Sequence, residues 1–158
     1  MKNVQLAILW HFHQPVYFEE IDEPASQPWV RLHAVKDYYD MVAILNDYPE
    51  IKMTFNFTPS LLEQIVAYDN GLLTDHFLYL AQKPAQSLTL EERIEILKNF
   101  FLANWSNMIQ PYPHYWSLLA KRGAMAHKEE LPKITKKFTD QDFTDLQVWF
   151  NLAWIDPS

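Results

Sequence analysis

Two segments near the N-terminus have the pattern of β-strands, and the order of the elements around them restricts the fold. Residues 4–10 are almost continuously apolar, which is typical of a parallel strand covered on both faces. Residues 51–57 alternate between apolar and polar side chains, the period of a strand. The second strand is followed by a helix, and another helix is predicted between the two strands. The order β-α-β-α predicts a parallel sheet with a right-handed crossover over residues 4–70.

The two helices of this unit have recognisable ends. Residues 35–45 carry apolar side chains at helical spacing, and Pro49 ends that pattern. Thr58 precedes Pro59 as an N-cap precedes proline at the first helical position, and the helix ends near residues 70–71. Residues 16–32, between the first strand and the first helix, are predicted to form a long loop of the kind that is often functional.

The rest of the chain is predicted to be helical. Thr89 and Glu92 form a capping-box pattern before a helix that continues through Met108. A short helix is expected to end before Gly123, and an exposed loop to occupy residues 124–137. The last helix begins at a cap, Thr139 or Asp140, and runs through Ala153. With two strands and several helices, the chain is of the α/β class, with a helix-rich insert after the second strand.

Composition excludes several classes of protein. The 158 residues carry a net charge of −7, which disfavours nucleic acid as a partner. Cysteine is absent, so disulfides and thiolate metal sites are excluded, and two glycines cannot supply a glycine-rich phosphate loop. The longest early apolar run, residues 6–10, is far shorter than the ~20 residues that span a bilayer, and no signal-peptide cleavage site follows it. We therefore expect a cytoplasmic protein with no membrane segment.

The triplet His11-Phe12-His13 is the strongest chemical feature of the sequence. Residues i and i+2 of a strand face the same side, so both imidazoles are expected at the carboxyl end of the first strand, where α/β proteins place their sites. A metal pair and a hydrogen-bonding cluster for a polar ligand both fit this pattern, as do two histidines bonded to neighbouring backbone. A metal site would need further ligands on later strands, and the other histidines fall on predicted loops or helices: His33, His76, His114 and His127.

The segment WHFHQPVY that contains this triplet resembles the first sequence motif of glycoside hydrolase family 57, whose hallmark is His-Gln-Pro. Three further segments are similar to the amylase-like branch of that family, so the resemblance covers residues 1–158: PWVRLHAVKDYYDMVAIL, TFNFTPSLLEQ and DLQVWFNLAWIDP. The resemblance implies a distorted (β/α)7 barrel of which this chain is the N-terminal part. It also implies a retaining enzyme that acts on α-glucans or oligosaccharides, with a Glu nucleophile and an Asp acid/base.

The resemblance transfers a substrate-binding role to His13, the histidine of the His-Gln-Pro motif. His11 shares its face and is a second candidate, and Gln14 is expected to orient the turn or the ring. The nucleophile and acid/base motifs of the family would lie beyond Ser158, so no catalytic residue is assigned within the chain. We therefore expect the 158-residue chain to be inactive alone, and the resemblance implies no cofactor and no metal ion.

Trp29 and Asn56 complete the candidate sugar-binding residues. Trp29, with Arg31 and His33, stands where the long loop meets its helix and would stack on the apolar face of a sugar. The alternative is packing at the helix entry, with Arg31 paired to Asp37 or another acid. Asn56 ends the second strand on its polar face and would point to the same end as His13, unless it only forms the turn.

The last helix, residues 143–155, is apolar on nearly every side, which predicts burial all round or association with another chain. Trp105, Trp116, Trp149 and Trp154 are predicted to be core residues because they lie at helical spacing. Two alternative functions remain open from the residues alone. One is a metal-dependent hydrolase using His11 and His13, and the other is a non-catalytic fragment that binds sugar or another chain.

Overall fold

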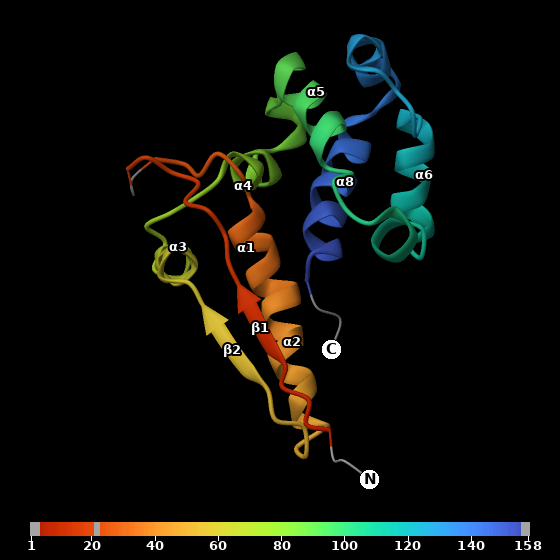
Figure 1. Cartoon of the computed structure of the whole chain (residues 1–158). Helices are drawn as coiled ribbons and strands as arrows, with labels where there is room; N and C mark the ends of the chain where they lie inside the picture. The colour runs from red at the N-terminus through yellow and green to blue at the C-terminus, as the bar shows by residue number, and fades with distance from the viewer. Residues whose placement is uncertain (1–3, 21–22, 156–158) are drawn as a thin grey trace. The chain divides into compact units, whose positions relative to one another are not determined.

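A computed structural model describes residues 4–20 and 23–155, which divide near His76 into an N-terminal unit and a helical C-terminal unit (Figure 1). The N-terminal unit contains two strands, β1 (Leu9–Phe12) and β2 (Thr54–Phe57), which pair in parallel. The register places His11 opposite Asn56 and Phe12 opposite Phe57. The parallel pairing of these two segments is the arrangement that the β-α-β-α order predicts.

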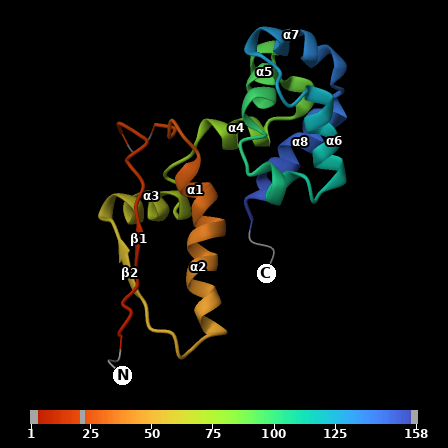
Figure 2. The same cartoon turned by 45° about the vertical axis from the view of Figure 1, so that its right-hand side comes forward.

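A continuous helical run separates the two strands. It comprises α1 (Trp29–His33), a π-helical turn (Ala34–Tyr38), α2 (Tyr39–Ala43) and a 3-10 turn (Ile44–Asn46). Figures 1 and 2 both show this run lying alongside the strands. Its buried Val30 packs with Phe12 of β1 and Leu61 of α3 (Pro59–Asp69) to form the core of the unit. The run begins at Trp29, so the loop predicted over residues 16–32 is four residues too long.

The predicted ends of α3 are confirmed. Thr58 has the extended backbone of an N-cap, Pro59 occupies the first turn, and Asn70 is the C-cap. Gly71 follows with φ of 68°, a left-handed conformation that glycine adopts without steric cost.

The first strand is shorter and more exposed than its apolar sequence predicts. Residues 4–8 lie outside β1, and the exposed fractions of Val4 and Leu6 are 93% and 84%. Among the described residues the sheet has two strands, so β1 pairs with one strand only. A helical layer lies beside it, but the described helices do not cover it on both faces as in a buried parallel strand. The prediction that this strand is covered on both faces is therefore wrong for the described residues. The (β/α)7 barrel remains a prediction.

The C-terminal unit is built from helices (Figure 2), and aromatic side chains form its core. Phe100 and Phe150 stack with centroids 4.5 Å apart, and Phe77 lies 6.0 Å from each. Its α-helices are α4 (His76–Gln82), α5 (Leu90–Asn99), α6 (Pro113–Arg122), α7 (Leu131–Ile134) and α8 (Asp140–Ala153). The short turns between them are the 3-10 segments Ala85–Ser87, Lys128–Glu130 and Thr135–Lys137 and the π-helical Trp105–Ile109.

Local capping signals predict the starts of two of these helices. Thr89 accepts a hydrogen bond from the Glu92 amide while the Glu92 carboxylate accepts one from Thr89, so the predicted capping box begins α5. Thr139 and Asp142 form a second box at the start of α8, which ends at Ala153 as expected. Gly123, with φ of 90°, ends α6 at the predicted position.

Two predictions about the helical part are wrong in extent, and one helix was not predicted. The helix expected to continue through Met108 ends at Asn99, where the Leu102 amide donates to the Asn99 carbonyl and closes a turn. The loop expected over residues 124–137 contains α7 and two 3-10 turns, because Leu131 and Ile134 are buried one helical turn apart. The α4 helix was not predicted from the sequence.

The last helix has one exposed side, so burial all round is wrong within the described residues. Phe143 and Phe150 are buried, whereas Val148 and Leu152 are 51% and 50% exposed. The tryptophans also divide: Trp154 is buried as predicted and Trp116 is 40% exposed. Within the described part of the chain, no helix is both long and apolar enough to cross a membrane.

Candidate functional site

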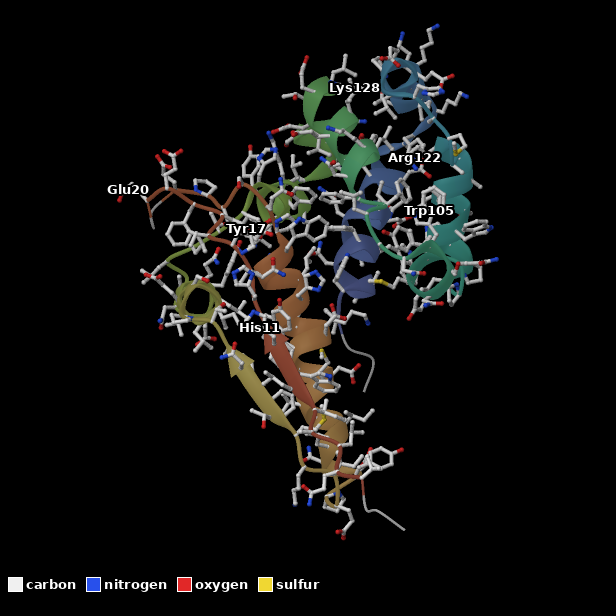
Figure 3. All side chains as sticks on the ribbon, in the orientation of Figure 1. His11, Tyr17, Glu20, Trp105, Arg122 and Lys128 are labelled. Atoms are coloured by element: carbon white, nitrogen blue, oxygen red, sulfur yellow. The ribbon has the colours of Figure 1, made fainter. Side chains whose placement is uncertain are left out.

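The carboxyl ends of the two parallel strands bring His11 and Asn56 together. Their strand positions are register partners, and Nδ1 of His11 lies 2.5 Å from Oδ1 of Asn56. The His13 ring is nearly parallel to that of His11, with centroids 5.9 Å apart and an interplanar angle of 11°. All three residues are exposed, and Figure 3 shows His11 near the end of β1. Three of the five predicted site residues therefore meet at this end of the sheet.

The amide oxygen of Asn56 can only accept a hydrogen bond, so this contact selects Nδ1 as the donor nitrogen of the neighbouring imidazole. Nδ1 of His11 donates the proton, and in the neutral ring Nε2 is left as an acceptor. This contact orients one of the two stacked imidazoles, while the other follows the strand on the same side. The pair can present both donors and acceptors to a polar ligand.

Gln14, the third predicted residue of this turn, is held on both sides of its amide. Nε2 donates to the Tyr38 hydroxyl at 3.0 Å, and Oε1 accepts from the Tyr17 hydroxyl at 2.9 Å. The Ser60 hydroxyl donates to the backbone carbonyl of Gln14 at 3.2 Å. Burial raises the pKa of Tyr17, and the nearby Tyr38 hydroxyl raises it further, so the phenol that holds Gln14 stays protonated. These contacts orient the turn that carries His13.

Gln64 on α3 anchors the same turn and was not identified from the sequence. Its side chain is fully buried, and Nε2 donates to the carbonyls of Pro15 and Ser60, each at 2.9 Å. Oε1 accepts a hydrogen bond from the Tyr17 amide at 3.1 Å. The one signal in the sequence is a polar side chain beside Leu61 and Ile65 on an apolar helix, which does not reveal the carbonyls it binds.

Trp29 lies at the first position of α1 and is half-buried beside His33, with ring centroids 6.2 Å apart. Nδ1 of His33 contacts the Asp37 carboxylate one helical turn along, and its ring lies 5.9 Å from that of Tyr38. Through Tyr38 and its bond to Gln14, this aromatic group is connected to the turn that carries His13. The structure thus joins Trp29 indirectly to the predicted site.

Arg31 pairs with Asp75 rather than with Asp37. Nε and Nη2 of the guanidinium donate to the two carboxylate oxygens at 2.6 and 3.2 Å, a bidentate geometry. Asp75 is fully buried and also accepts a hydrogen bond from Tyr68 at 3.3 Å, so it is a structural partner. Burial raises the pKa of Tyr68, and the neighbouring carboxylate adds to this effect. Asp75 is the second important residue that sequence reasoning missed.

Residues 4–20 and 23–155 contain no group of three or more His, Cys, Asp or Glu side chains that could hold a metal ion. The Nδ1 edge of the His11 ring contacts the amide oxygen of Asn56. The arrangement is that of a hydrogen-bonding edge beside an aromatic cluster.

Comparison with known proteins identifies the chain by its family. Searches of curated proteins and of solved structures found no match. A family model described as glycosyl hydrolase family 57 matches residues 7–158, which includes both strands, the His-Gln-Pro turn and all the described helices. This family indicates a glycoside hydrolase with a carbohydrate substrate. Because the match covers nearly the whole chain, this protein belongs to glycosyl hydrolase family 57.

Proposed function

We propose that the chain supplies a sugar-binding edge of a retaining glycoside hydrolase that acts on α-glucans. His13 and His11 are the residues that bind the sugar. The observation that carries this proposal is the parallel imidazole pair at the carboxyl ends of adjacent strands, with His11 held by Asn56. Carboxyl ends of parallel strands are where open and closed α/β folds bind their ligands.

The two rings suit the neighbouring hydroxyl groups of a glucose unit. A neutral imidazole donates from one nitrogen and accepts at the other, and a hydroxyl does both. Since the proton of His11 is directed to Asn56, its Nε2 accepts from one sugar hydroxyl, while His13 donates to or accepts from the next. Trp29 adds an aromatic surface for the apolar face of a sugar unit, and Gln14 holds the turn between them.

Hydrolysis needs two carboxylates about 5–5.5 Å apart in a retaining enzyme. Asp75 is buried in its pair with Arg31, and Asp37 contacts His33, so these two acids are already engaged. We therefore propose that the nucleophile and the acid/base are supplied from outside residues 1–158. The chain alone then binds α-glucan without cleaving it.

Titration of the 158-residue chain with maltoheptaose, followed by calorimetry, tests the binding role. His13→Ala removes up to two hydrogen bonds of about 0.5–1.5 kcal/mol each, so the dissociation constant is expected to rise about tenfold. His114→Ala is the matched control, because this exposed histidine lies in the C-terminal unit and pairs with Asp145. Equal affinities for the wild type and His13→Ala would remove the proposed role.

A reducing-end assay on the same samples tests the absence of hydrolysis. No release of reducing sugar above background is expected from the chain alone. Turnover that disappears in Asp37→Asn while glucan binding persists would place a catalytic carboxylate inside the chain and contradict the proposal.

A further inference from the structure

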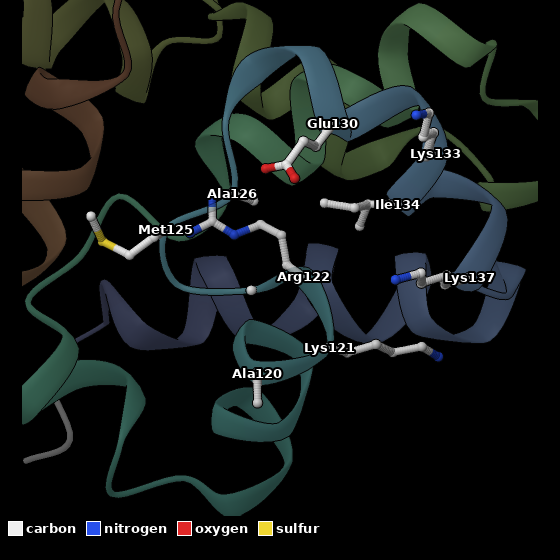
Figure 4. A pocket seen from close by; sticks show the side chains of 10 residues that line it. Ala120, Lys121, Arg122, Met125, Ala126, Glu130, Lys133, Ile134 and Lys137 are labelled. Atoms are coloured by element: carbon white, nitrogen blue, oxygen red, sulfur yellow. The ribbon is translucent and has the colours of Figure 1, made fainter.

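A cavity of about 540 Å³ lies within the C-terminal unit, apart from the imidazole pair. Its walls come from the end of α6, the segment after Gly123 and the short helices up to Lys137 (Figure 4). Four basic side chains line it, together with one acid and an apolar portion: Lys121, Arg122, Lys133, Lys137, Glu130 and Ile134. The volume is in the range of small-molecule sites, about 300–1,000 Å³.

The charge around this cavity is opposite to that of the rest of the protein. Residues 121–137 hold six of the 13 basic residues of the chain and only two of its 20 acidic residues. The whole chain nevertheless carries a net charge of −7. A local cluster of one sign beside low-dielectric walls concentrates ions of the opposite sign, so this cavity attracts anions although the protein as a whole repels them.

The basic groups differ in how well they are neutralised. Lys121 pairs with Asp142 at 2.7 Å, whereas neither Lys133 nor Lys137 has a carboxylate within ion-pairing distance in the part of the chain that the structure describes. Both of these lysines are exposed, and both line the cavity. Two ammonium groups are thus available to an anion without breaking an existing ion pair.

Arg122 is half-buried, whereas the three lysines of the group are exposed. Its Nη1 donates to the Leu97 carbonyl at 3.3 Å and its guanidinium lies 4.8 Å above the Phe101 ring. Nε is buried and has no hydrogen-bond partner among the described residues. Burial lowers the pKa of Arg122. In Figure 4 the guanidinium extends from α6 toward the side lined by Ala126 and Glu130.

We propose that this cavity binds a phosphorylated small molecule whose organic part carries hydroxyl groups. Lys133 and Lys137 bind the phosphate oxygens, and the guanidinium of Arg122 supplies a third positive charge. Glu130 repels a phosphate and accepts from hydroxyls, so it directs the organic part to its own side of the cavity; its carboxylate is held in place by the His127 amide at 2.8 Å. Ile134 and Met125 provide apolar contact for the ligand carbons.

Calorimetric titration of the full chain with glucose 6-phosphate, inorganic phosphate and glucose tests the site. These probes separate the contributions of the phosphate and the hydroxylated ring. Glucose 6-phosphate is expected to bind more tightly than inorganic phosphate, and glucose not to bind at this site. No binding of glucose 6-phosphate, or equal affinities for it and inorganic phosphate, would overturn the proposal of a phosphorylated organic ligand.

Two double variants with the same change in net charge locate the binding. Lys133→Gln with Lys137→Gln is expected to weaken glucose 6-phosphate binding at least tenfold. Lys128→Gln with Lys136→Gln removes two charges from the same basic segment but from residues outside the cavity lining, and less than a twofold change is expected. If both double variants weaken glucose 6-phosphate binding equally, the ligand responds to the general positive charge of the segment, and the proposed site is contradicted.

The test of the cavity with glucose 6-phosphate is independent of the sugar-binding role proposed for His11 and His13. The cavity variants leave His11 and His13 unchanged, so maltoheptaose affinity measured on each variant shows whether the N-terminal unit is intact. Loss of glucose 6-phosphate binding with unchanged maltoheptaose binding supports the cavity alone. Failure of maltoheptaose binding in the wild type contradicts only the imidazole edge.

Discussion

Replacing Gln64 by leucine is expected to free the turn that carries His13. The substitution removes three hydrogen bonds, to the Pro15 and Ser60 carbonyls and from the Tyr17 amide, at 2.9, 2.9 and 3.1 Å. A typical hydrogen bond contributes about 0.5–1.5 kcal/mol, and a buried group left without a partner costs about 1–3 kcal/mol. Because leucine recovers part of this loss by packing in a fully buried position, we expect unfolding of the N-terminal unit to become easier by about 2–4 kcal/mol.

Hydrogen exchange of the Tyr17 amide gives the local readout, because this amide donates directly to Gln64. A loss of about 1.4 kcal/mol corresponds to a tenfold change in an equilibrium constant, so exchange is expected to accelerate by about tenfold or more. Urea denaturation measures the loss in the free energy of unfolding, and the NMR shifts of the His11 and His13 rings report on the turn.

Gln147→Leu is the matched control for the buried amide. Gln147 is also a buried helical glutamine that donates to two carbonyls, of Leu80 at 2.6 Å and Lys83 at 2.8 Å, but within the C-terminal unit. It should destabilise that unit without changing Tyr17 exchange. The reasoning is refuted if Gln64→Leu leaves Tyr17 exchange unchanged, or if both variants accelerate it equally.

Three further substitutions test contacts outside this turn. Arg31→Met removes the guanidinium that pairs with the buried Asp75 carboxylate, so urea denaturation should show a loss of about 3–5 kcal/mol, and an unchanged midpoint would exclude a stabilising pair. The hydrogen bond from Lys83 lowers the pKa of Glu92 below its ordinary 4.5, so its stabilisation is present above that pH and is lost as the pH falls through the folded-state pKa. Glu92→Gln should therefore reduce the acid sensitivity of thermal unfolding, and an identical pH profile would contradict this. Gly123→Ala places a side chain at φ of 90° with its nearest contact at 3.9 Å, so backbone strain alone should cost about 1–3 kcal/mol by urea denaturation; no loss would count against that strain.

Elements whose ends depend on neighbouring residues could be predicted from the sequence. Thr89 and Glu92 satisfy each other across a single turn, and so the start of α5 follows from four residues. The parallel pairing of β1 and β2 follows from the helix between them, because a crossover is needed to bring parallel strands together. The meeting of His11 and Asn56 at one edge is a consequence of the same pairing.

Apolar spacing alone did not reveal where helices stop. The apolar residues from Ile94 through Met108 keep a helical period, yet the backbone leaves α5 at Phe100, which is fully buried and stacks on Phe150. Tertiary contact with a distant helix decides this boundary, and no local residue records it. In the basic segment, the buried Leu131 and Ile134 were concealed by the lysines around them.

The partner of Arg31 shows the same limit within the candidate site. Asp37 is the nearest acid along the helical run, but it is four residues from His33, the spacing at which helical side chains meet, and it contacts that histidine. The guanidinium is therefore left for Asp75, 44 residues away, where burial of the carboxylate makes a bidentate cation necessary. Local spacing predicts the contact between His33 and Asp37. The pair of Arg31 and Asp75 depends instead on how α1 and the segment after α3 pack. The residues that hold the site in place are thus less visible in sequence than the imidazoles that they support.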